Sequence, residues 1–344
     1  MAQVSAPAPL DQLQRPLRSL RLSVTDRCNL RCAYCMPEEH YQWLPRPDIL
    51  SYGELSALVE LFAEAGVNRV RLTGGEPLLR RDLFKLVERL RSIHQLNDIA
   101  MTTNGLLLQD NVKDLHRAGL DRLTISLDTL DADKFRSLTR RDGIEQVFAG
   151  LRAANEVGFT GTKVNSVIMR GTNEDEIPAL LDFAIEHGAE LRFIEYMDVG
   201  GASGWQPDLV FSGEQILARI RDSHGDFAEI PSRDAAPANR YRLENGACFG
   251  VIASTTTPFC ANCDRSRVTA DGLWFRCLYA TSGIDLRQSL RAGKLDEVRQ
   301  IIFSQWESRT DRGAAERAEI VLSKRQAQST DPDNIHLEMH VRGG

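Results

Sequence analysis

The chain has 344 residues, of which 42% are hydrophobic and 26% are charged, and its formal net charge is −6 at pH 7. A chain of this size can bury a large core in one or two domains. The acidic balance argues against a general nucleic-acid binder, which needs a basic field. The sequence has no 18-residue apolar run and no basic start followed by an apolar core. We therefore expect neither a membrane span nor a signal peptide, and we expect a cytoplasmic protein.

The predicted elements alternate regularly along the first two thirds of the chain. Residues 1–16 are rich in Ala and Pro and are expected to be disordered, since they offer little apolar surface to offset the entropy of ordering. A strand-like run at 19–24 precedes a helix that opens on the capping box Ser51-Tyr52-Gly53-Glu54. Apolar periodicity then predicts five more strand and helix units, with strands at 69–73, ending at 103, and at 122–127, 163–168 and 191–196.

This alternation predicts an α/β fold. Strands joined by helical crossovers form a parallel sheet with helices outside, and six units are too few to close an eight-stranded barrel. We expect a partial (β/α)6 barrel of the TIM type at residues 17–230 and a C-terminal β-containing extension at residues 231–344. Active sites of such barrels form past the carboxyl ends of the strands. In this chain, that position is taken by a cysteine loop, by Gly74-Gly75-Glu76-Pro77, and by Ser126 and Met197.

The first group of cysteines lies just after the first strand. Cys28, Cys32 and Cys35 are separated by three and then two residues, and a seventh, isolated cysteine, Cys248, makes the total odd. This usage suits metal ligation in a reducing compartment better than a disulfide framework. One tetrahedral zinc needs a fourth ligand, and none is obvious nearby, whereas a four-iron cluster presents a separate iron to each thiolate. An iron–sulfur cluster with one open iron is favoured, and a zinc knuckle or a chance cluster of thiols is the alternative.

The second group, Cys260, Cys263 and Cys277, lies in the expected extension. A zinc ribbon needs a fourth ligand, but Leu278-Tyr279 stands where a paired cysteine is expected. The missing ligand favours a second iron–sulfur cluster with an open iron. Arg265, Ser266 and Arg267 follow Cys263 directly, so two guanidinium groups are expected beside this cluster, where they suit a phosphate group.

Basic residues on the predicted strands indicate an anion inside the barrel. Lys163 and Asn165 are two apart on one strand, so their side chains share a face. Arg21, Arg71 and Thr102 lie on three earlier strands and can join Lys163 around a polyphosphate, because Arg offers bidentate donors and Lys a compact charge. For any one of these residues, a solvated surface salt bridge is the alternative.

The first cysteine spacing, with an aromatic residue before the last cysteine, resembles the radical S-adenosylmethionine superfamily. The resemblance implies that the open iron holds the amine and carboxylate of S-adenosylmethionine, whose cleavage releases a 5′-deoxyadenosyl radical. It also implies that Tyr34, Gly75, Ser126 and Met197 contact this cofactor.

Longer stretches resemble the GTP 3′,8-cyclase family, molybdenum cofactor biosynthesis protein A. They are Arg21-Leu-Ser-Val-Thr-Asp-Arg-Cys28, Thr73-Gly-Gly-Glu-Pro77, Phe193-Ile-Glu-Tyr-Met197, the second cysteine group and the terminal Gly343-Gly344. The resemblance implies two [4Fe-4S] clusters and radical cyclisation of GTP to (8S)-3′,8-cyclo-7,8-dihydroguanosine 5′-triphosphate, the first step of molybdenum cofactor biosynthesis. The implied GTP contacts are Arg21, Arg71, Thr102, Lys163, Arg265, Ser266 and Arg267, with the guanine at the second cluster.

The same resemblance implies a catalytic role for Gly343 and Gly344, for which a frayed chain end is the alternative. The implied partners are an external electron donor, a downstream cyclic pyranopterin monophosphate synthase and a second copy of the chain as a homodimer, with no nucleic acid and no membrane. Two alternative functions remain open: a radical peptide-modifying enzyme with an auxiliary cluster, and a non-catalytic zinc-ribbon binding module. Residues 309–333 match no pattern that predicts a function.

Overall fold

The computed structural model describes residues 8–38, 40–199, 205–231, 235–317 and 339–342. Among these residues, twelve strands form one sheet. The strands are β1 (Ser19–Ser23), β2 (Arg69–Thr73), β3 (Asp98–Thr103), β4 (Arg122–Ser126), β5 (Lys163–Ile168), β6 (Glu190–Glu195), β7 (Phe227–Ile230), β8 (Asn239–Leu243), β9 (Cys248–Ile252), β10 (Arg265–Val268), β11 (Leu273–Phe275) and β12 (Ile284–Asp285).

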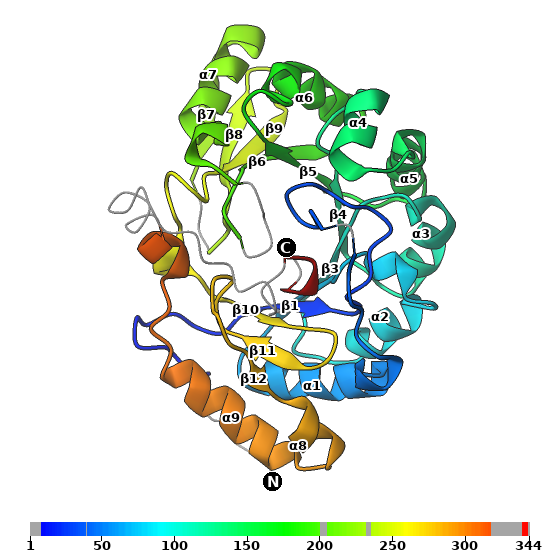
Figure 1. The fold of residues 1–344 in the computed structure, drawn as a ribbon, viewed down its shortest axis with the longest axis vertical. Helices are drawn as coiled ribbons and strands as arrows, with labels where there is room; N and C mark the ends of the chain where they lie inside the picture. The colour runs from blue at the N-terminus through cyan, green and yellow to red at the C-terminus, as the bar shows by residue number, and fades with distance from the viewer. Residues whose placement is uncertain (1–7, 39, 200–204, 232–234, 318–338, 343–344) are drawn as a thin grey trace.

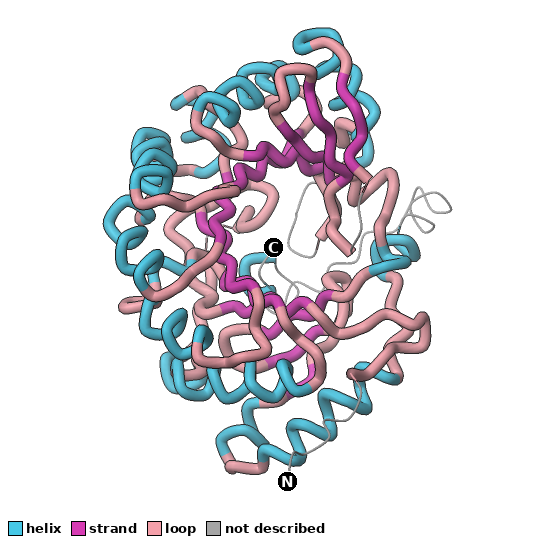
Figure 2. The backbone as a smooth tube through the Cα atoms, turned by 180° about the vertical axis from the view of Figure 1, so that it is seen from behind, coloured by secondary structure: helices cyan, strands magenta, loops and turns pink. Residues whose placement is uncertain are grey.

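Helices cover the outside of this curved sheet, as Figures 1 and 2 show. They are α1 (Tyr52–Glu64), α2 (Phe84–Arg91), α3 (Leu108–Arg117), α4 (Ala132–Thr139), α5 (Ile144–Glu156), α6 (Ile177–Glu186), α7 (Gly213–His224), α8 (Arg287–Arg291), α9 (Leu295–Glu307) and α11 (Met339–Arg342). The predicted capping box is present at α1, where the Ser51 hydroxyl accepts from the Glu54 amide and the Glu54 carboxylate accepts from the Ser51 amide. The short α11 differs from the other helices because it lies inside the curve (Figure 1).

The sheet confirms the predicted fold class and contains two strand pairings that were not predicted. Strands β1 to β6 are parallel and follow one another in sequence order. Strand β9 then joins β6 in parallel and β10 joins β1 in parallel, so the C-terminal extension lengthens the sheet at both ends. The hairpin of β7 and β8 spans residue 230, where we expect the division between the two parts. That division stays a prediction.

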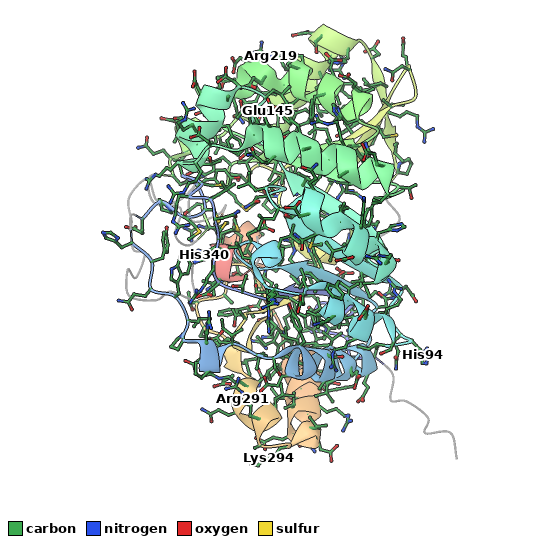
Figure 3. The ribbon with its side chains drawn as sticks, turned by 90° about the vertical axis from the view of Figure 1, so that its right-hand side faces the viewer. His94, Glu145, Arg219, Arg291, Lys294 and His340 are labelled. Carbon is green, nitrogen blue, oxygen red and sulfur yellow. The ribbon has the colours of Figure 1, made fainter. Side chains whose placement is uncertain are left out.

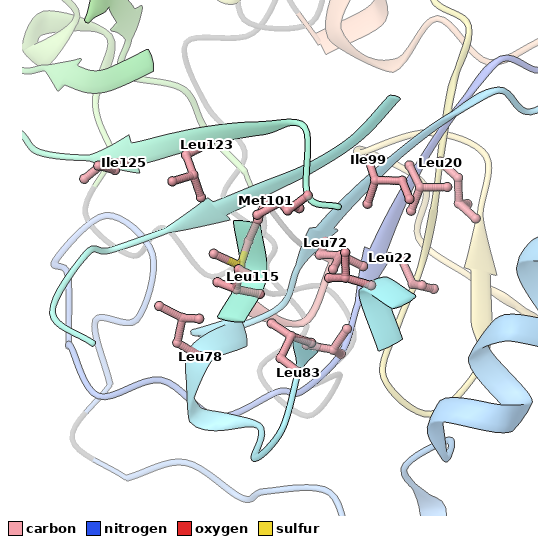
Figure 4. Packing of buried hydrophobic residues seen from close by; sticks show 14 of the residues in the cluster. Leu20, Leu22, Leu72, Leu78, Leu83, Ile99, Met101, Leu115, Leu123 and Ile125 are labelled. Atoms are coloured by element: carbon pink, nitrogen blue, oxygen red, sulfur yellow. The ribbon is translucent and has the colours of Figure 1, made fainter. Parts of the chain in front are cut away.

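The core lies between the outer face of the sheet and the helices. Alternate residues of the first strands, such as Leu20, Leu22 and Leu72, are at most 1% exposed and pack in one cluster (Figure 4). The alternation follows from the two-residue period of a strand, which sends every second side chain outward toward the helices. Burying each leucine stabilises the fold by about 1.5–3 kcal/mol. The intervening residues point to the inside of the curve, where the candidate site forms.

Residues 8–16 differ from the expectation of disorder. Asp11 and Arg15 are buried and form an ion pair with an Nε to Oδ2 distance of 2.6 Å. The indole of Trp306, on α9, donates a hydrogen bond to the Arg15 carbonyl. The surface that orders this segment comes from the other end of the chain, so local composition did not reveal it. In the described part of the chain, no helix combines the length and apolar character needed to cross a membrane.

Candidate active site

A cavity of about 340 Å³ lies on the inner side of the sheet. Its walls come from strands β1 to β6 and from the segment that carries the second cysteine group. The predicted site residues that line it are Arg21, Arg71, Thr102, Met197, Cys260, Cys263, Arg265, Arg267 and Cys277. The fold therefore brings together residues that the sequence distributes over more than half of the chain.

Three arginines form one row across the cavity wall. Arg21 stands opposite Arg267 on β10 and opposite Arg71 on β2, so the three side chains are in register on adjacent parallel strands. Burial and the neighbouring arginines lower the pKa of Arg21 well below its usual value, and they lower the pKa of Arg71 and of Arg267 to about 10. Buried like charges disfavour one another, and an anion in the cavity relieves that repulsion. This row suits a polyphosphate.

Arg71 is held by two hydroxyl groups. Its Nη1 donates to Thr102 Oγ1 at 3.1 Å and to Thr124 Oγ1 at 2.9 Å. Two further arginines, Arg122 and Arg192, line the cavity and lower the pKa of Arg71 after the larger effect of burial. We did not predict their role. Arg192 pairs with Asn165 on the neighbouring strand. The sequence places Asn165 on the inner face of the sheet, and this pairing would place Arg192 there as well.

Two of the predicted GTP contacts stand apart from the cavity wall. Lys163 is buried, but it is not among the lining residues, and its Nζ donates to the Gly161 carbonyl at 3.4 Å. Burial and the nearby charges of Arg192 and Arg122 lower its pKa to about 8. Ser266 lies between Arg265 and Arg267, so strand alternation turns its side chain to the opposite face, where it is 1% exposed.

The first cysteine loop follows β1 and keeps its three thiols close together. Burial raises the pKa of Cys32, and the neighbouring Cys35, Asp128 and Cys28 raise it further. The loop turns on a hydrogen bond from the Cys35 amide to the Cys32 carbonyl at 3.0 Å. Cys28 Sγ accepts from the Leu30 amide at 3.5 Å. Donors aimed at sulfur fit thiolates that hold an iron–sulfur cluster.

The glycine-rich turn packs directly on this loop. Gly74 has a φ of 143°, and a Cβ built at Gly75 lies 2.2 Å from the Arg27 carbonyl oxygen. The Gly75 amide donates to the Thr25 carbonyl at 2.9 Å. No side chain fits between the two backbones, which is why glycine is needed here. The turn after β2 thus supports the cysteine loop.

Glu76 connects this turn to the end of β3. Its carboxylate is fully buried and accepts from the Leu78 amide, Thr103 Oγ1 and the Asn104 amide at 3.0, 2.8 and 2.7 Å. Burial raises the pKa of Glu76 to about 7 in spite of these hydrogen bonds. The Asn104 side chain in turn donates to Cys28 Sγ at 3.9 Å. We did not predict these roles for Glu76 and Asn104, although the sequence places both just past strand ends.

The remaining predicted cofactor contacts lie on later strands. Tyr34 Oη donates to Asp128 Oδ2 at 2.7 Å, and Asp128 Oδ1 accepts from the Val167 amide at 2.8 Å. Ser126 ends β4, two residues before Asp128, and Met197 follows β6 and lines the cavity. Tyr34 is thereby fixed to the strand ends that carry the other predicted contacts.

The second cysteine group lies in a more cationic setting. Burial raises the pKa of the Cys263 thiol, but the Arg265 and Arg309 guanidinium groups outweigh burial and lower it to about 7. Arg265 Nη2 donates to Cys263 Sγ at 3.6 Å. A Cβ built at Gly313 lies 3.0 Å from Cys277 Sγ, so this glycine leaves room at the sulfur. The three cysteines line one cavity and fit a cluster beside the arginine row.

Within the described ranges, no three His, Cys, Asp or Glu side chains gather closely enough to hold a single metal ion. A four-iron cluster makes no such demand, because each thiolate binds a different iron.

The inner helix α11 brings the C-terminal part of the chain to the cavity. Met339 lines the cavity, Ser23 Oγ donates to the Val341 carbonyl at 2.8 Å, and Arg267 Nη1 donates to the Arg342 carbonyl at 3.3 Å. Figure 3 shows His340 on this inner helix, and its ring meets Tyr41 edge-on. Gly343 and Gly344 lie outside the described residues.

Comparison with known proteins agrees with this geometry. The family model of the Radical SAM superfamily matches residues 22–184, and that of Molybdenum Cofactor Synthesis C matches residues 189–315. The structure of Streptococcus suis SuiB bound to S-adenosylmethionine has a TM-score of 0.61 at 16% identity and covers 89% of this chain and 68% of its own. This likeness supports the fold. The class is therefore a radical S-adenosylmethionine barrel with a molybdenum cofactor synthesis extension.

Similar sequences identify the family within this class. GTP 3′,8-cyclase 1 of Mycobacterium tuberculosis is 50% identical over 98% of this chain and 97% of its own length. The GTP 3′,8-cyclase of Streptomyces coelicolor is 47% identical over 84% of this chain and 85% of its own. The chain belongs to the GTP 3′,8-cyclase family. Membership confirms the predicted resemblance and the predicted cofactors, S-adenosylmethionine and [4Fe-4S] clusters, one of which belongs to the C-terminal part.

Proposed function

We propose that this chain cyclises GTP to (8S)-3′,8-cyclo-7,8-dihydroguanosine 5′-triphosphate, the first step of molybdenum cofactor biosynthesis. One observation on this chain's own residues supports the proposal. The row of Arg21, Arg71 and Arg267 and the second cysteine group line the same cavity. A ligand that satisfies both needs a polyanionic end and an end that can meet an open iron, and GTP has both.

Each cysteine group binds one cluster. Cys28, Cys32 and Cys35 hold the first cluster, and Cys260, Cys263 and Cys277 hold the second. S-adenosylmethionine, bound at the first cluster, supplies the radical chemistry. Tyr34, Gly75, Ser126 and Met197 hold this cofactor at the carboxyl ends of the strands.

The arginine row orients the substrate. Arg21, Arg71 and Arg267 bind the triphosphate through paired N–H donors, and Thr102 holds the Arg71 guanidinium by accepting a hydrogen bond from it. Arg265 acts beside the second cluster. A radical abstracts hydrogen from whichever C–H bond lies nearest, so holding both ends of GTP selects the ribose carbon that reacts. Lys163 is on the same face of β5 as Asn165 but does not line the cavity, so it contributes its charge from outside the lining. Ser266 contributes through its backbone.

Gly343 and Gly344 follow in the sequence directly after α11, a helix that is anchored at the cavity. Val341 and Arg342 are tied to β1 and β10 by the hydrogen bonds from Ser23 and Arg267. A backbone without side chains fits a cavity that already holds two clusters, a cofactor and a nucleotide. Deleting both glycines should leave iron content and cofactor cleavage nearly intact and reduce the cyclised product strongly. Full product yield would show that the pair is only a chain end.

The proposed partners are those that the family resemblance implies. Reductive cleavage of the cofactor needs an external electron donor, and the product is passed to a cyclic pyranopterin monophosphate synthase. A homodimer is a further proposal, tested by sedimentation. We also propose a cytoplasmic location, because reduced cysteines are maintained there.

The test of the function is anaerobic incubation with a strong reductant, S-adenosylmethionine and each nucleoside triphosphate in turn. We expect 5′-deoxyadenosine and a cyclised nucleotide, detected by mass spectrometry, only with GTP. Cys32→Ala is the control, and it should form neither product. Equal turnover with ATP or CTP would contradict the assignment of guanine to the second cluster.

A further inference from the structure

The N-terminal segment, residues 8–16, lies directly behind the second cysteine group. The Gln12 amide donates to the Arg309 carbonyl at 3.2 Å, and Trp306 Nε1 donates to the Arg15 carbonyl at 3.0 Å. Segments from opposite ends of the chain are therefore joined here by one backbone hydrogen bond and one side-chain hydrogen bond. The function proposed above gives this junction no role.

One carboxylate at the junction holds two guanidinium groups. Asp11 Oδ2 lies 2.6 Å from Arg15 Nε and 3.3 Å from Arg309 Nη1. All three side chains are at most 2% exposed. Removing charges from water is costly, and a buried set of this kind persists only where geometry and further hydrogen bonds offset that cost. Arg309 also stacks on Trp306, with its Cζ 4.5 Å from the ring centroid.

The further hydrogen bonds lead to the cysteines. Arg15 Nη1 donates to the Cys260 carbonyl at 2.9 Å, and Arg309 Nη1 donates to the Cys263 carbonyl at 2.9 Å. Each planar guanidinium thus bridges the Asp11 carboxylate and the backbone of a cysteine, a task that suits its rigid fork of donors. The two carbonyls belong to neighbouring ligands of the second cluster, three residues apart.

We propose that Asp11, Arg15 and Arg309 are positioning residues of the second cluster. They fix the backbone of Cys260 and Cys263, and their charges act on the cluster from the side opposite the cavity. The inference rests on the second cluster of the proposed function. Its consequence is measurable, because the potential of an iron–sulfur cluster depends on nearby charge and on how its ligands are held.

The experiment isolates the second cluster by replacing Cys28, Cys32 and Cys35 with Ala in the full chain. After anaerobic reconstitution, this background should hold about four irons per chain. Its reduction potential is measured by a redox titration followed by electron paramagnetic resonance. Arg15→Gln and Arg309→Gln are then introduced separately. Arg18→Gln is the matched control, because Arg18 lies in the same part of the chain and is exposed.

The expected shifts have defined signs. Loss of a positive charge disfavours the reduced cluster, so Arg15→Gln and Arg309→Gln should lower the potential, change the resonance spectrum and reduce the iron retained. Asp11→Asn removes a negative charge and should raise the potential. Arg15→Lys keeps the charge but offers one nitrogen, so the potential should return toward that of the background while the spectrum stays altered. Arg18→Gln should change neither quantity.

The outcomes separate the two proposals. Background spectra and potentials in folded Arg15→Gln and Arg309→Gln, as judged by circular dichroism, would overturn the positioning role and leave the proposed function intact. If either variant does not fold, Asp11→Asn and Arg15→Lys decide by the signs given above. A background protein that retains no iron would instead contradict the second cluster itself, and the positioning role would be rejected with it.

Discussion

Each of the two cysteine groups has three cysteines, but the groups are supported by different parts of the chain. Cys28, Cys32 and Cys35 lie on one loop, and the turns after β2 and β3, the next strands in sequence, support it. The second group combines a loop after β9 with Cys277 after β11, and its support comes from both ends of the chain. A motif with local support can be recognised from sequence, whereas a site with distributed support depends on the whole fold.

Cys28 of the first group and Cys263 of the second have different electrostatic surroundings, although burial raises the pKa of Cys277, also in the second group. Burial, to which Glu76 adds, raises the pKa of Cys28 to about 11, whereas Arg265 and Arg309 hold that of Cys263 at about 7. A metal must therefore displace a tightly held proton at Cys28, whereas it meets a partly ionised thiol at Cys263. The cationic surroundings of the second group are continuous with the arginine row, on the side where an anionic substrate is expected.

The largest expected effects come from removing one ligand of each group. Cys32→Ala should abolish cleavage of S-adenosylmethionine, and Cys263→Ala should spare the first cluster but prevent productive GTP placement. Each variant should fall from about eight irons per chain to about four. Iron and sulfide analysis and product formation measure both effects. Full cyclisation by Cys263→Ala would show that the second cluster has only a structural role.

The effect of burial near the first cysteine group can be tested by the pH dependence that Glu76 gives to protein stability. Its folded-state pKa is raised from 4.5 to about 7, so the folded chain binds the proton more tightly than the unfolded chain does. Its contribution to stability is therefore complete below pH 4.5 and is lost as the pH rises toward 7, by up to about 3 kcal/mol. Glu76→Gln should remove this part of the pH dependence.

Urea unfolding of the cluster-free chain between pH 4 and pH 8 measures this difference. Glu88→Gln, at an exposed position of α2, is the control and should keep the wild-type profile. A Glu76→Gln profile parallel to that of the wild type would show that the folded and unfolded chains bind the Glu76 proton equally, and so that the pKa of Glu76 is not raised in the folded chain.

The surroundings of the second group can be tested through the arginine row. Arg71→Ala and Arg267→Ala should each weaken GTP binding by about 1–3 kcal/mol, the usual cost of losing a charge-assisted contact. Binding of S-adenosylmethionine should change little, because none of the three cysteines of the first group lines the cavity that holds the row. Calorimetric titration of both ligands measures the two affinities, with the exposed Arg89→Ala as control. If Arg71→Ala and Arg267→Ala bound GTP as tightly as Arg89→Ala does, the arginine row would have only a structural role.

The parts of this fold that sequence predicts are those governed by local rules. The capping box at Ser51, the apolar periodicity of the helices and the alternation on β1 to β6 fix the barrel because each is decided within a few residues. The positions past the strand ends then follow from parallel topology. Met197 lies past the end of β6 and follows from this rule, whereas Arg21, Arg71 and Thr102 lie within β1, β2 and β3 and follow from their place on predicted strands. All four line the cavity.

The parts that sequence did not predict depend on pairings between distant segments. The parallel partners of β9 and β10 are far away in the chain, so nothing local to either strand reveals them. The order of residues 8–16 is decided by Trp306 and Arg309, which bury Asp11 and Arg15. The buried charges at that junction have no local periodicity and so gave no signal.

A smaller effect is expected at Lys163. Its Nζ donates to the Gly161 carbonyl, and the side chain does not line the cavity, so its charge acts on the nucleotide only from a distance. Lys163→Ala should weaken GTP binding by less than Arg71→Ala does. Because the pKa of Lys163 is lowered to about 8, the difference from wild type should shrink between pH 7 and pH 9. A loss equal to that of Arg71→Ala would mean that Lys163 enters the cavity when GTP binds.

The smallest effect is expected at Ser266, although Arg265 and Arg267 flank it in the sequence. Ser266 pairs with Leu20, a residue of the outer core, so its side chain points away from the cavity. Its hydroxyl has no hydrogen-bond partner among the described residues, so removing it leaves no group unsatisfied. Ser266→Ala should keep wild-type GTP affinity and unfolding free energy, within about 0.5 kcal/mol. A loss comparable to that of Arg267→Ala would mean that the hydroxyl itself binds the nucleotide, which requires β10 to turn over and would contradict the register that aligns Arg267 with Arg21.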